Sequence, residues 1–180
     1  MPGFNINGTG ALDGGPANTL ETRRKHRWIF KTLGKGQTQF ESKVLLVLKT
    51  ATRPHPTFEE PVMHHNQEQA YFAGKHSWEA CTMSWYDIEQ GPDVSKEMFD
   101  WLNKVCDIST VKVSVPSQYK SYGQLEMLKG DGKPSESWRM YGCWPQDINW
   151  GDLDYENTEI NLIEIIMRFD RAYRETPSSE

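Results

Sequence analysis

The sequence has few cysteines, and none of them form a pair at the spacing of a metal or disulfide motif. Cys81, Cys106 and Cys143 are odd in number and far apart, with no CxxC pair among them. This excludes a disulfide framework or a zinc ribbon as the basis of the fold. Free cysteines fit assembly in a reducing cytoplasm, and the sequence leaves open whether any of the three cross-link.

Long hydrophobic runs are also missing. The longest unbroken aliphatic run, Val44 to Leu48, is far too short to span a bilayer as a helix, so no membrane partner is expected. Met1 leads into FNINGTGALDGG, which has neither a basic start nor an apolar stretch, and no signal peptide is predicted. With a hydrophobic content of 37% and a mean hydropathy of −0.71, the chain must have a small hydrophobic core or a large exposed surface.

Recognisable catalytic and cofactor motifs are absent. The chain contains no GxSxG, P-loop or dinucleotide-binding fingerprint. His64 and His65 are adjacent and would point to opposite faces of a strand, so they could not chelate one metal together. The acids at 152, 154 and 156 lack the spacing of a calcium-binding loop. We therefore expect no catalytic residue, no metal and no cofactor, although a hydrolase using scattered acids stays open.

Charge is distributed unevenly along the chain. Residues 1–50 hold eight Lys/Arg against three Asp/Glu, residues 51–100 three against nine, and residues 137–180 four against nine. Such polarity suits head-to-tail contact between copies, but it is equally explained by solvated sheet edges and loops. A net charge of −5 argues against tight binding of duplex DNA, so the basic run RRKHR indicates an exposed or interfacial strand end.

Three regions are predicted: an N-terminal arm at 1–22, a β domain at 23–174 and a frayed tail at 175–180. The arm is rich in Gly, Asn and Pro, and its spaced apolar residues Phe4, Ile6 and Leu12 suit burial on a neighbouring subunit. Prolines make 51–61 an extended loop. Alternating apolar residues predict strands over 22–33, 39–50, 76–87, 121–129, 137–144 and 158–173. Residues 62–72 are predicted as a strand with two polar faces, which forms a long hairpin with 76–87 through a turn at Gly74 and Lys75.

One helix is predicted, from Asp93 to Cys106. Asp93 is a natural N-cap, and apolar residues including Met98 and Trp101 recur behind it at helical spacing. The pattern of strands with a single helix predicts a mainly β fold, an antiparallel β sandwich or small barrel with one flanking α-helix. The expected core anchors are Trp101, Leu102, Trp138, Trp144, Ile163, Ile165 and Phe169.

Residues 137–174 carry the most specific pattern. An alternating run ends in Gly142, Trp144 and Pro145, an acid-rich loop follows to about Asn157, and a second alternating run then begins. The segment YGCWPQDINWGDLDYENTEINLIEIIMRFDRAYRE resembles the C-terminal signature of the tail tube proteins of contractile-tailed bacteriophages. KTATRPHP, HSWEACTMSWYD and KEMFDWLN are similar to further segments of that family, in the same order.

The resemblance implies a structural virion protein, not an enzyme, located in the phage tail and assembled in the host cytoplasm. Subunits would join into hexameric rings with a ring-wide inner β-barrel. The rings would stack into a tube that contacts sheath, baseplate and terminator proteins and passes double-stranded DNA without binding it tightly. Expected inter-ring or inter-subunit contacts are Arg53, Pro54, His55, Pro56 and Phe58 besides the arm, and expected lumen or ring-surface acids are Glu59, Glu60, Glu68 and Glu79.

Two alternatives stay open at this point. The first is the tube protein of a type VI secretion system or a bacteriocin-like contractile system, which has the same architecture. The second is a β-sandwich module that binds or hydrolyses carbohydrate through a cleft of exposed tryptophans, of which the chain has seven.

Overall fold

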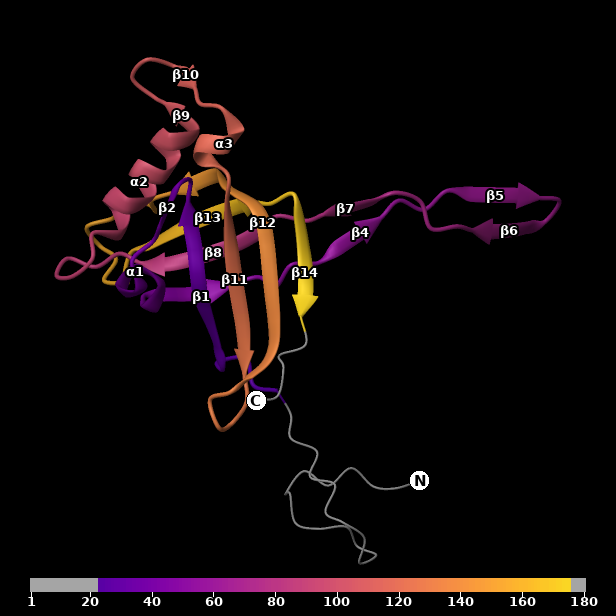
Figure 1. The fold of residues 1–180 in the computed structure, drawn as a ribbon, viewed down its shortest axis with the longest axis horizontal. Coiled ribbons are helices and arrows are strands. Elements are labelled where there is room, and N and C mark those ends of the chain that lie inside the picture. Colours follow the sequence, from indigo (N-terminus) through magenta and orange to yellow (C-terminus); the bar gives the residue numbers. More distant parts are fainter. Residues whose placement is uncertain (1–22, 176–180) are drawn as a thin grey trace, which may run out of the picture.

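The computed structural model describes residues 23–175, and they fold around one long, bent strand. Figure 1 shows the arrangement. The elements are β1 (Trp28–Lys35), β2 (Thr38–Gln39), α1 (Ser42–Leu46), β3 (Leu48–Ala51), β4 (Pro56–Phe58), β5 (Val62–His65), β6 (Glu68–Tyr71), β7 (His76–Trp78), β8 (Cys81–Tyr86), α2 (Val94–Val105), β9 (Cys106–Asp107), β10 (Lys112–Val113), α3 (Pro116–Tyr119), β11 (Ser121–Leu128), β12 (Pro134–Asn149), β13 (Leu162–Arg168) and β14 (Arg171–Glu175).

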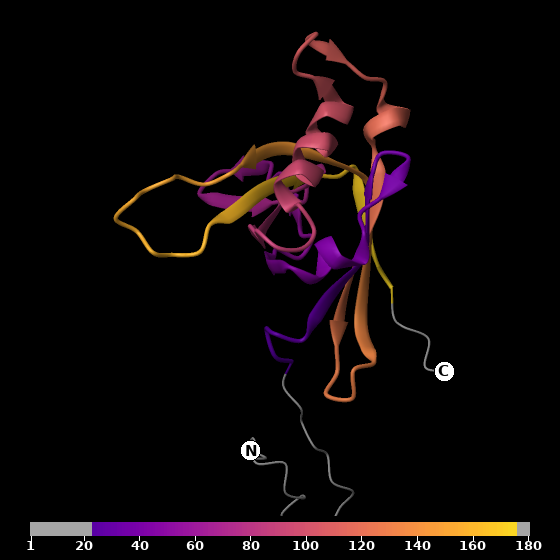
Figure 2. The same ribbon diagram turned by 90° about the vertical axis from the view of Figure 1, so that its left-hand side faces the viewer.

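The main sheet is antiparallel and runs in the order β2-β1-β11-β12-β13-β8-β3, with β14 also paired to β12. The first part of β12 pairs with β11 and β14, and its second part, from Trp144, pairs with β13. We call β1, β11, the first part of β12 and β14 the front sheet, and the second part of β12 with β13, β8 and β3 the back sheet. Figure 2 shows the back sheet turning away from the front sheet. The mainly antiparallel β fold predicted from the sequence is confirmed.

A glycine allows the bend in β12. Gly142 has φ +73°, in the left-handed region that residues with a Cβ rarely adopt. A Cβ at this position would also lie 2.1 Å from Oδ2 of Asp170, a residue of the β13–β14 corner. The backbone can therefore pass from one sheet to the other only because this residue has no side chain.

The core lies between the two sheets and under α2. Cys81, Met83 and Trp85 alternate along β8, and Ile163, Ile165 and Met167 alternate along β13, all essentially without exposed surface. Asp93 caps α2 by accepting a hydrogen bond from the backbone N–H of Lys96 at 2.9 Å, as the sequence predicts. The buried stripe of α2 includes Trp101, whose ring meets that of Phe40 edge-on at 5.1 Å between centroids. The described residues also contain two short helices that the sequence did not predict, α1 with five residues and α3 with four.

The strand predicted over 39–50 is wrong. Val44 and Leu45 are both buried whereas Leu46 is 72% exposed, because the chain turns through the short helix α1 before β3 begins. The Phe40 and Val44 side chains do face the core, as predicted. Their spacing of four residues fits one helical turn as well as it fits a strand, and the pattern alone could not separate the two.

The single strand predicted over 62–72 is wrong as well. It is a two-stranded hairpin, β5 and β6, which turns at Asn66 with φ +55°. Part of the predicted 51–61 loop is also a strand, since β4 pairs with β7. The partner of 62–72 is therefore not 76–87: residues 56–78 form one long hairpin of their own, and β8 starts only at Cys81.

The predicted boundaries near the C-terminus also shift. β12 continues through Trp144 and Pro145 to Asn149, because the register slips between Pro145 and Asp147 and a proline is tolerated at such an irregularity. The acidic loop therefore spans 150–161 instead of 145–157. The last strand is interrupted at Phe169 and Asp170, where the chain crosses from the back sheet to the front sheet as β14.

Candidate assembly surfaces

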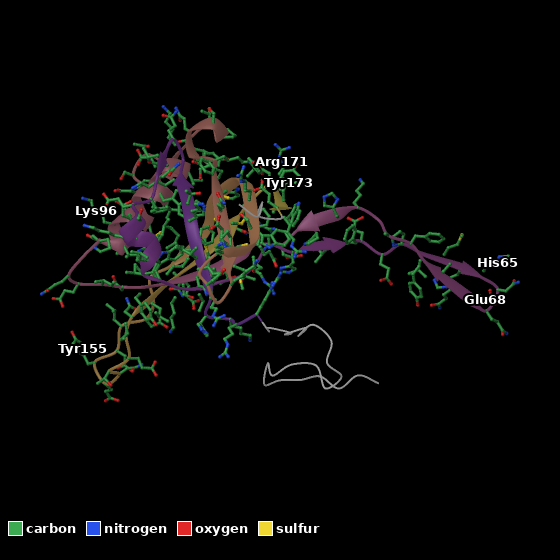
Figure 3. The ribbon with its side chains drawn as sticks, turned by 60° about the horizontal axis from the view of Figure 1, so that its bottom comes forward. His65, Glu68, Lys96, Tyr155, Arg171 and Tyr173 are labelled. Carbon is green, nitrogen blue, oxygen red and sulfur yellow. The ribbon has the colours of Figure 1, made fainter. Side chains whose placement is uncertain are left out.

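Residues 56–78, which we call the projecting hairpin, extend well away from both sheets (Figures 1 and 3). The two arms are held by backbone bonds such as Glu59 N–H to the Lys75 carbonyl at 2.9 Å and Gly74 N–H to the Glu59 carbonyl at 2.8 Å. Figure 3 places His65 and Glu68 at the far end. Apart from Gly74 and Trp78, every residue of this hairpin is exposed.

The projecting hairpin carries large apolar side chains in water. Those exposed by more than 40% are Phe58, Val62, Met63, Tyr71 and Phe72. A two-stranded ribbon without a core is marginal by itself, and an exposed apolar patch on such an element is typical of a contact surface. The hairpin is therefore the clearest interaction element among residues 23–175.

The sequence-predicted contact residues lie at the root of this hairpin and on its first arm. Pro54 is buried, whereas Arg53, His55, Pro56 and Phe58 are exposed. The predicted acids Glu59, Glu60, Glu68 and Glu79 all belong to the same hairpin or its base, and Glu79 accepts a hydrogen bond from Thr57 at 3.0 Å. Phe4, Ile6 and Leu12 lie outside the described residues.

A buried glutamate sits beside the root of the hairpin. Glu136 of β12 is 3% exposed and forms ion pairs with Arg23, with Arg174 at 3.4 Å and with Arg53 at 3.8 Å. Its Oε1 also accepts a hydrogen bond from Trp138 Nε1 at 2.5 Å. Burial by itself would raise the pKa of this carboxyl, but the Trp138 bond and the three arginine charges outweigh it and hold the pKa below its usual range.

The solvent face of the front sheet presents paired charges and tyrosines. Arg171 lies over the rings of Tyr141 and Tyr173, at 5.4 and 5.7 Å from their centroids; Figure 3 labels Arg171 and Tyr173. On the same face Lys31 pairs with Glu126 at 3.4 Å, and Arg139 pairs with Glu175 at 3.1 Å. The cations of this face therefore have partners within the face.

The front sheet ends in two strands with free edges. Within residues 23–175, β14 pairs only with β12, and β1 pairs with β11 on one side and with β2 only at Gly34 and Lys35 on the other. Unpaired strand edges are templates for pairing with another chain.

The acidic loop 150–161 lies on the side away from the front sheet (Figure 2), and all of its residues are exposed except the half-buried end residues Trp150 and Asn161. Leu153 is 91% exposed, and Tyr155 and Ile160 are also exposed, among four acids and no base. Asn161 fixes the base of the loop by donating to the Trp150 carbonyl at 3.1 Å and to Asp87 at 3.0 Å.

The predicted core anchors have different surroundings. Trp101, Ile163, Ile165 and Phe169 are buried, and Leu102 and Trp138 pack partly buried against the core. Trp144 is half-buried instead beside Tyr119, with 6.1 Å between the ring centroids, in a shallow pocket of about 370 Å³. None of the seven tryptophans is exposed, so the cleft that the carbohydrate-binding alternative requires is not formed.

Metal-ligand clusters, membrane-spanning helices and disulfides are all missing from the part of the chain between 23 and 175. It contains no group of three or more His, Cys, Asp or Glu side chains placed to hold a metal ion. No helix in that part is long and apolar enough to cross a membrane. Cys81, Cys106 and Cys143 are free.

Sequence reasoning missed the Glu136 cluster and the Tyr141–Arg171–Tyr173 group. The partners of Glu136 come from three distant segments, and no local pattern links them. The second group had a weak signal, since Arg171 and Tyr173 are two apart on a strand and must share a face.

Within residues 23–175, the structure combines a two-layer antiparallel sheet, free strand edges and long exposed projections, which are typical of a chain that assembles with other chains. The T4-like virus tail tube protein gp19 family matches residues 82–172, half of the chain. The tail tube protein of Serratia phage KSP90 is 25% identical over 138 residues, which cover 73% of this chain and 76% of that protein. The chain belongs to the T4-like tail tube family, whose members are structural proteins of the phage tail.

Solved structures of contractile systems share the fold. The anti-feeding prophage tube-terminating cap matches with a TM-score of 0.65 at 17% identity, covering 92% of this chain and 99% of that chain. The sheath–tube complex of an extracellular contractile injection system matches with a TM-score of 0.62 at 13% identity, covering 86% and 92%.

Proposed function

We propose that copies of this chain form hexameric rings that stack into the hollow tail tube of a phage, through which double-stranded DNA passes on ejection. The observation that carries this proposal is the combination of two free edges on the front sheet with a long hairpin that has no partner within residues 23–175. The protein then resides in the virion after assembly in the host cytoplasm. It acts by polymerisation, without catalysis or a cofactor.

The rings close through the front sheet. Each successive pair from β1 through β11 and β12 to β14 is antiparallel, so the two edge strands β1 and β14 run in opposite directions. Pairing β14 of one copy with β1 of the next therefore continues the same antiparallel pattern from copy to copy. Closure around the ring would remove every free front-sheet edge and create an inner barrel shared by all subunits.

The rings stack through the projecting hairpin, together with the arm at 1–22. Laying Met63, Tyr71 and Phe72 on a second copy would bury apolar surface that a lone subunit leaves in water. The acids of the hairpin would then face the basic N-terminal part of the neighbour. This charge polarity supports a fixed head-to-tail order.

The lumen is lined by the solvent face of the front sheet. Its cations are already engaged, Lys31 with Glu126, Arg139 with Glu175 and Arg171 with two tyrosines. Cations that have partners displace fewer counterions from DNA, so the wall would not hold passing phosphates tightly. The acidic loop lies on the side away from the front sheet and would face the tail sheath, while the tube ends contact baseplate and terminator proteins.

Shortening the hairpin tests this proposal. Residues 60–73 are replaced by Asn-Gly, which reconnects Glu59 and Gly74 where their backbones already bond at 2.8 Å. The variant should fold and form rings of wild-type size, because the removed residues are exposed, yet it should form no tubes in electron micrographs.

In a matched control, residues 152–159 of the acidic loop are replaced by the same Asn-Gly pair. This variant should still form tubes. Tubes of normal length from the hairpin variant would overturn the stacking role. A wild-type chain that forms no rings would overturn the proposed function itself.

A further inference from the structure

We propose that Glu136 is a positioning residue that sets how the projecting hairpin and residues 23–27, the segment before β1, are oriented relative to the front sheet. This inference rests on the proposed function only for its effect on tube growth. The placement of the hairpin can be measured on the isolated subunit.

The geometry joins three segments at one carboxylate. Arg23 follows the N-terminal 22 residues and precedes β1, Arg53 lies between β3 and the hairpin, and Arg174 lies in β14. Glu136 Oε2 contacts Arg23 and Arg174, and Oε1 contacts Arg53. The side chain of Glu136 is only 4% exposed, while those of the three arginines are 50–57% exposed. Three side chains that reach in from the surface thus converge on one buried charge.

The energetics favour a single arrangement. A buried carboxylate without partners is strongly unfavourable, so the cations around Glu136 lower the free-energy cost of burying its charge. Each guanidinium is planar and pairs with carboxylate oxygens in a narrow range of directions. The three segments are therefore restrained relative to one another, although their positions in the sequence are far apart.

The hairpin has few other attachments to the sheets. On the back-sheet side, Arg168 donates to the Trp78 carbonyl at 3.0 Å, and the Trp78 ring meets that of Phe169 at 5.7 Å. Thr52 N–H donates to the Thr82 carbonyl at 2.9 Å. The Arg53–Glu136 pair links this root to the front sheet, next to a shallow pocket that Pro54 and His55 share with Trp138 of β12. It connects the stacking element to the sheet whose edge strands, β1 and β14, close the ring.

The test compares Glu136→Gln with Glu126→Gln, a matched loss of charge from a second buried glutamate on the adjacent strand of the same sheet. Amide hydrogen exchange is measured on the subunit before assembly. Glu136→Gln should speed exchange at residues 55–79 by about tenfold, the result of easier local opening, and Glu126→Gln should leave those residues at the wild-type rate. The Glu136→Gln chain should still form rings, but the mean length of its tubes should be much shorter than that of wild-type tubes.

Two milder variants keep the inference testable if Glu136→Gln fails to fold. Arg53→Gln should speed exchange in 55–79 and leave 24–28 unchanged, and Arg23→Gln should do the reverse. Unchanged exchange at 55–79 in both Glu136→Gln and Arg53→Gln would overturn the inference. So would equal acceleration throughout the chain, which indicates general destabilisation. Absence of wild-type tubes would count against the proposed function and leave the exchange result standing.

Discussion

At the scale of single residues, Gly142 is the position on which the two-layer fold depends most directly. It combines a left-handed backbone with close contact to Asp170, whose carboxylate is held by Lys120 Nζ at 2.7 and 2.8 Å. Gly132, in the turn before β12, has a similar φ of +81° but no atom within 4 Å of an added Cβ. Alanine substitutions at these two glycines therefore distinguish the cost of a left-handed backbone from the cost of a steric clash.

We therefore predict different costs for alanine at these two glycines. Gly132→Ala should lower the free energy of unfolding by about 1–2 kcal/mol, from its left-handed backbone alone. Gly142→Ala should cost about 1–3 kcal/mol more, because the new methyl group meets a side chain that is held in place. Urea unfolding followed by tryptophan fluorescence measures both. Equal losses in the two variants would contradict the role assigned to the Gly142–Asp170 contact.

The thiols give a second prediction at this scale. Burial raises the pKa of Cys81 to about 12 and also raises that of Cys143, so neither forms a thiolate near neutral pH. Cys106 is only half-buried. Brief maleimide treatment of the native chain at pH 7.5 should label Cys106 alone, as read by peptide mass spectrometry. All three should react in urea, and native labelling of Cys81 or Cys143 would be the contrary result.

The sequence predicts which side chains are buried where apolar residues recur at a regular spacing along one strand or helix. The alternation in 158–173 identified the buried face of β13, and the alternation in 76–87 predicted the strand β8, because a half-buried strand must alternate. The surroundings of Glu136 could not be predicted in this way. Its three arginine partners are brought together by the sheet topology, and a glutamate between Ser135 and Ser137 carries no mark of burial.

At the scale of elements, strands and turns could not be predicted correctly in short segments that have no buried face. The stretch 62–72 alternates weakly because neither of its faces is buried, so nothing in the pattern marks the turn at Asn66. In the stretch 39–50, the apolar spacing fits a strand, although these residues form a helical turn, α1, followed by the short strand β3. The elements predicted best, α2 and the β11–β12 hairpin, have clear caps or turn residues and one buried face.

The free edges of β1 and β14 give a prediction at this scale. Two double-cysteine variants are made in a chain whose half-buried Cys106 is changed to serine. One variant has cysteines in place of Tyr173 on β14 and Ile29 on β1, and the other has them in place of Tyr173 and Lys31. The Tyr173, Ile29 and Lys31 side chains all lie exposed on the front-sheet face. Neighbouring antiparallel strands bring opposed Cα atoms within the range of a disulfide.

Mild oxidation of assembled rings should produce, in one of the two pairings, a ladder of cross-linked species that ends at the hexamer on a non-reducing gel. Each single-cysteine variant should give none. If neither pair cross-links in rings that are visible by microscopy, the ring does not close through these edges.

At the scale of the whole molecule, the exposed surfaces fit the assembly that we propose. The chain has a lean composition, with a mean hydropathy of −0.71, yet it exposes Phe58, Met63, Tyr71 and Leu153 on projections. A chain that acted alone would gain nothing from apolar groups on elements without a core. As part of a tube, the hairpin, the sheet edges and the acidic loop would each have a separate partner.

Charge at this scale also differs from the simplest expectation. The acids predicted for the lumen or ring surface lie on the projecting hairpin or, in the case of Glu79, at its base. The front-sheet face that we propose for the lumen carries Lys31, Arg139 and Arg171 with Glu126 and Glu175. Passage of DNA would then depend on cations that already have partners rather than on an acidic wall.

Electron cryomicroscopy of the purified wild-type chain would show ring closure and stacking in one experiment. It should reveal hollow tubes of stacked sixfold rings, with a continuous antiparallel barrel built from β1, β11, β12 and β14. Arg171 should face the lumen, and residues 56–78 should rest on the next ring. A chain that stays monomeric at high concentration, or rings whose lumen is lined by the back sheet, would contradict this assembly.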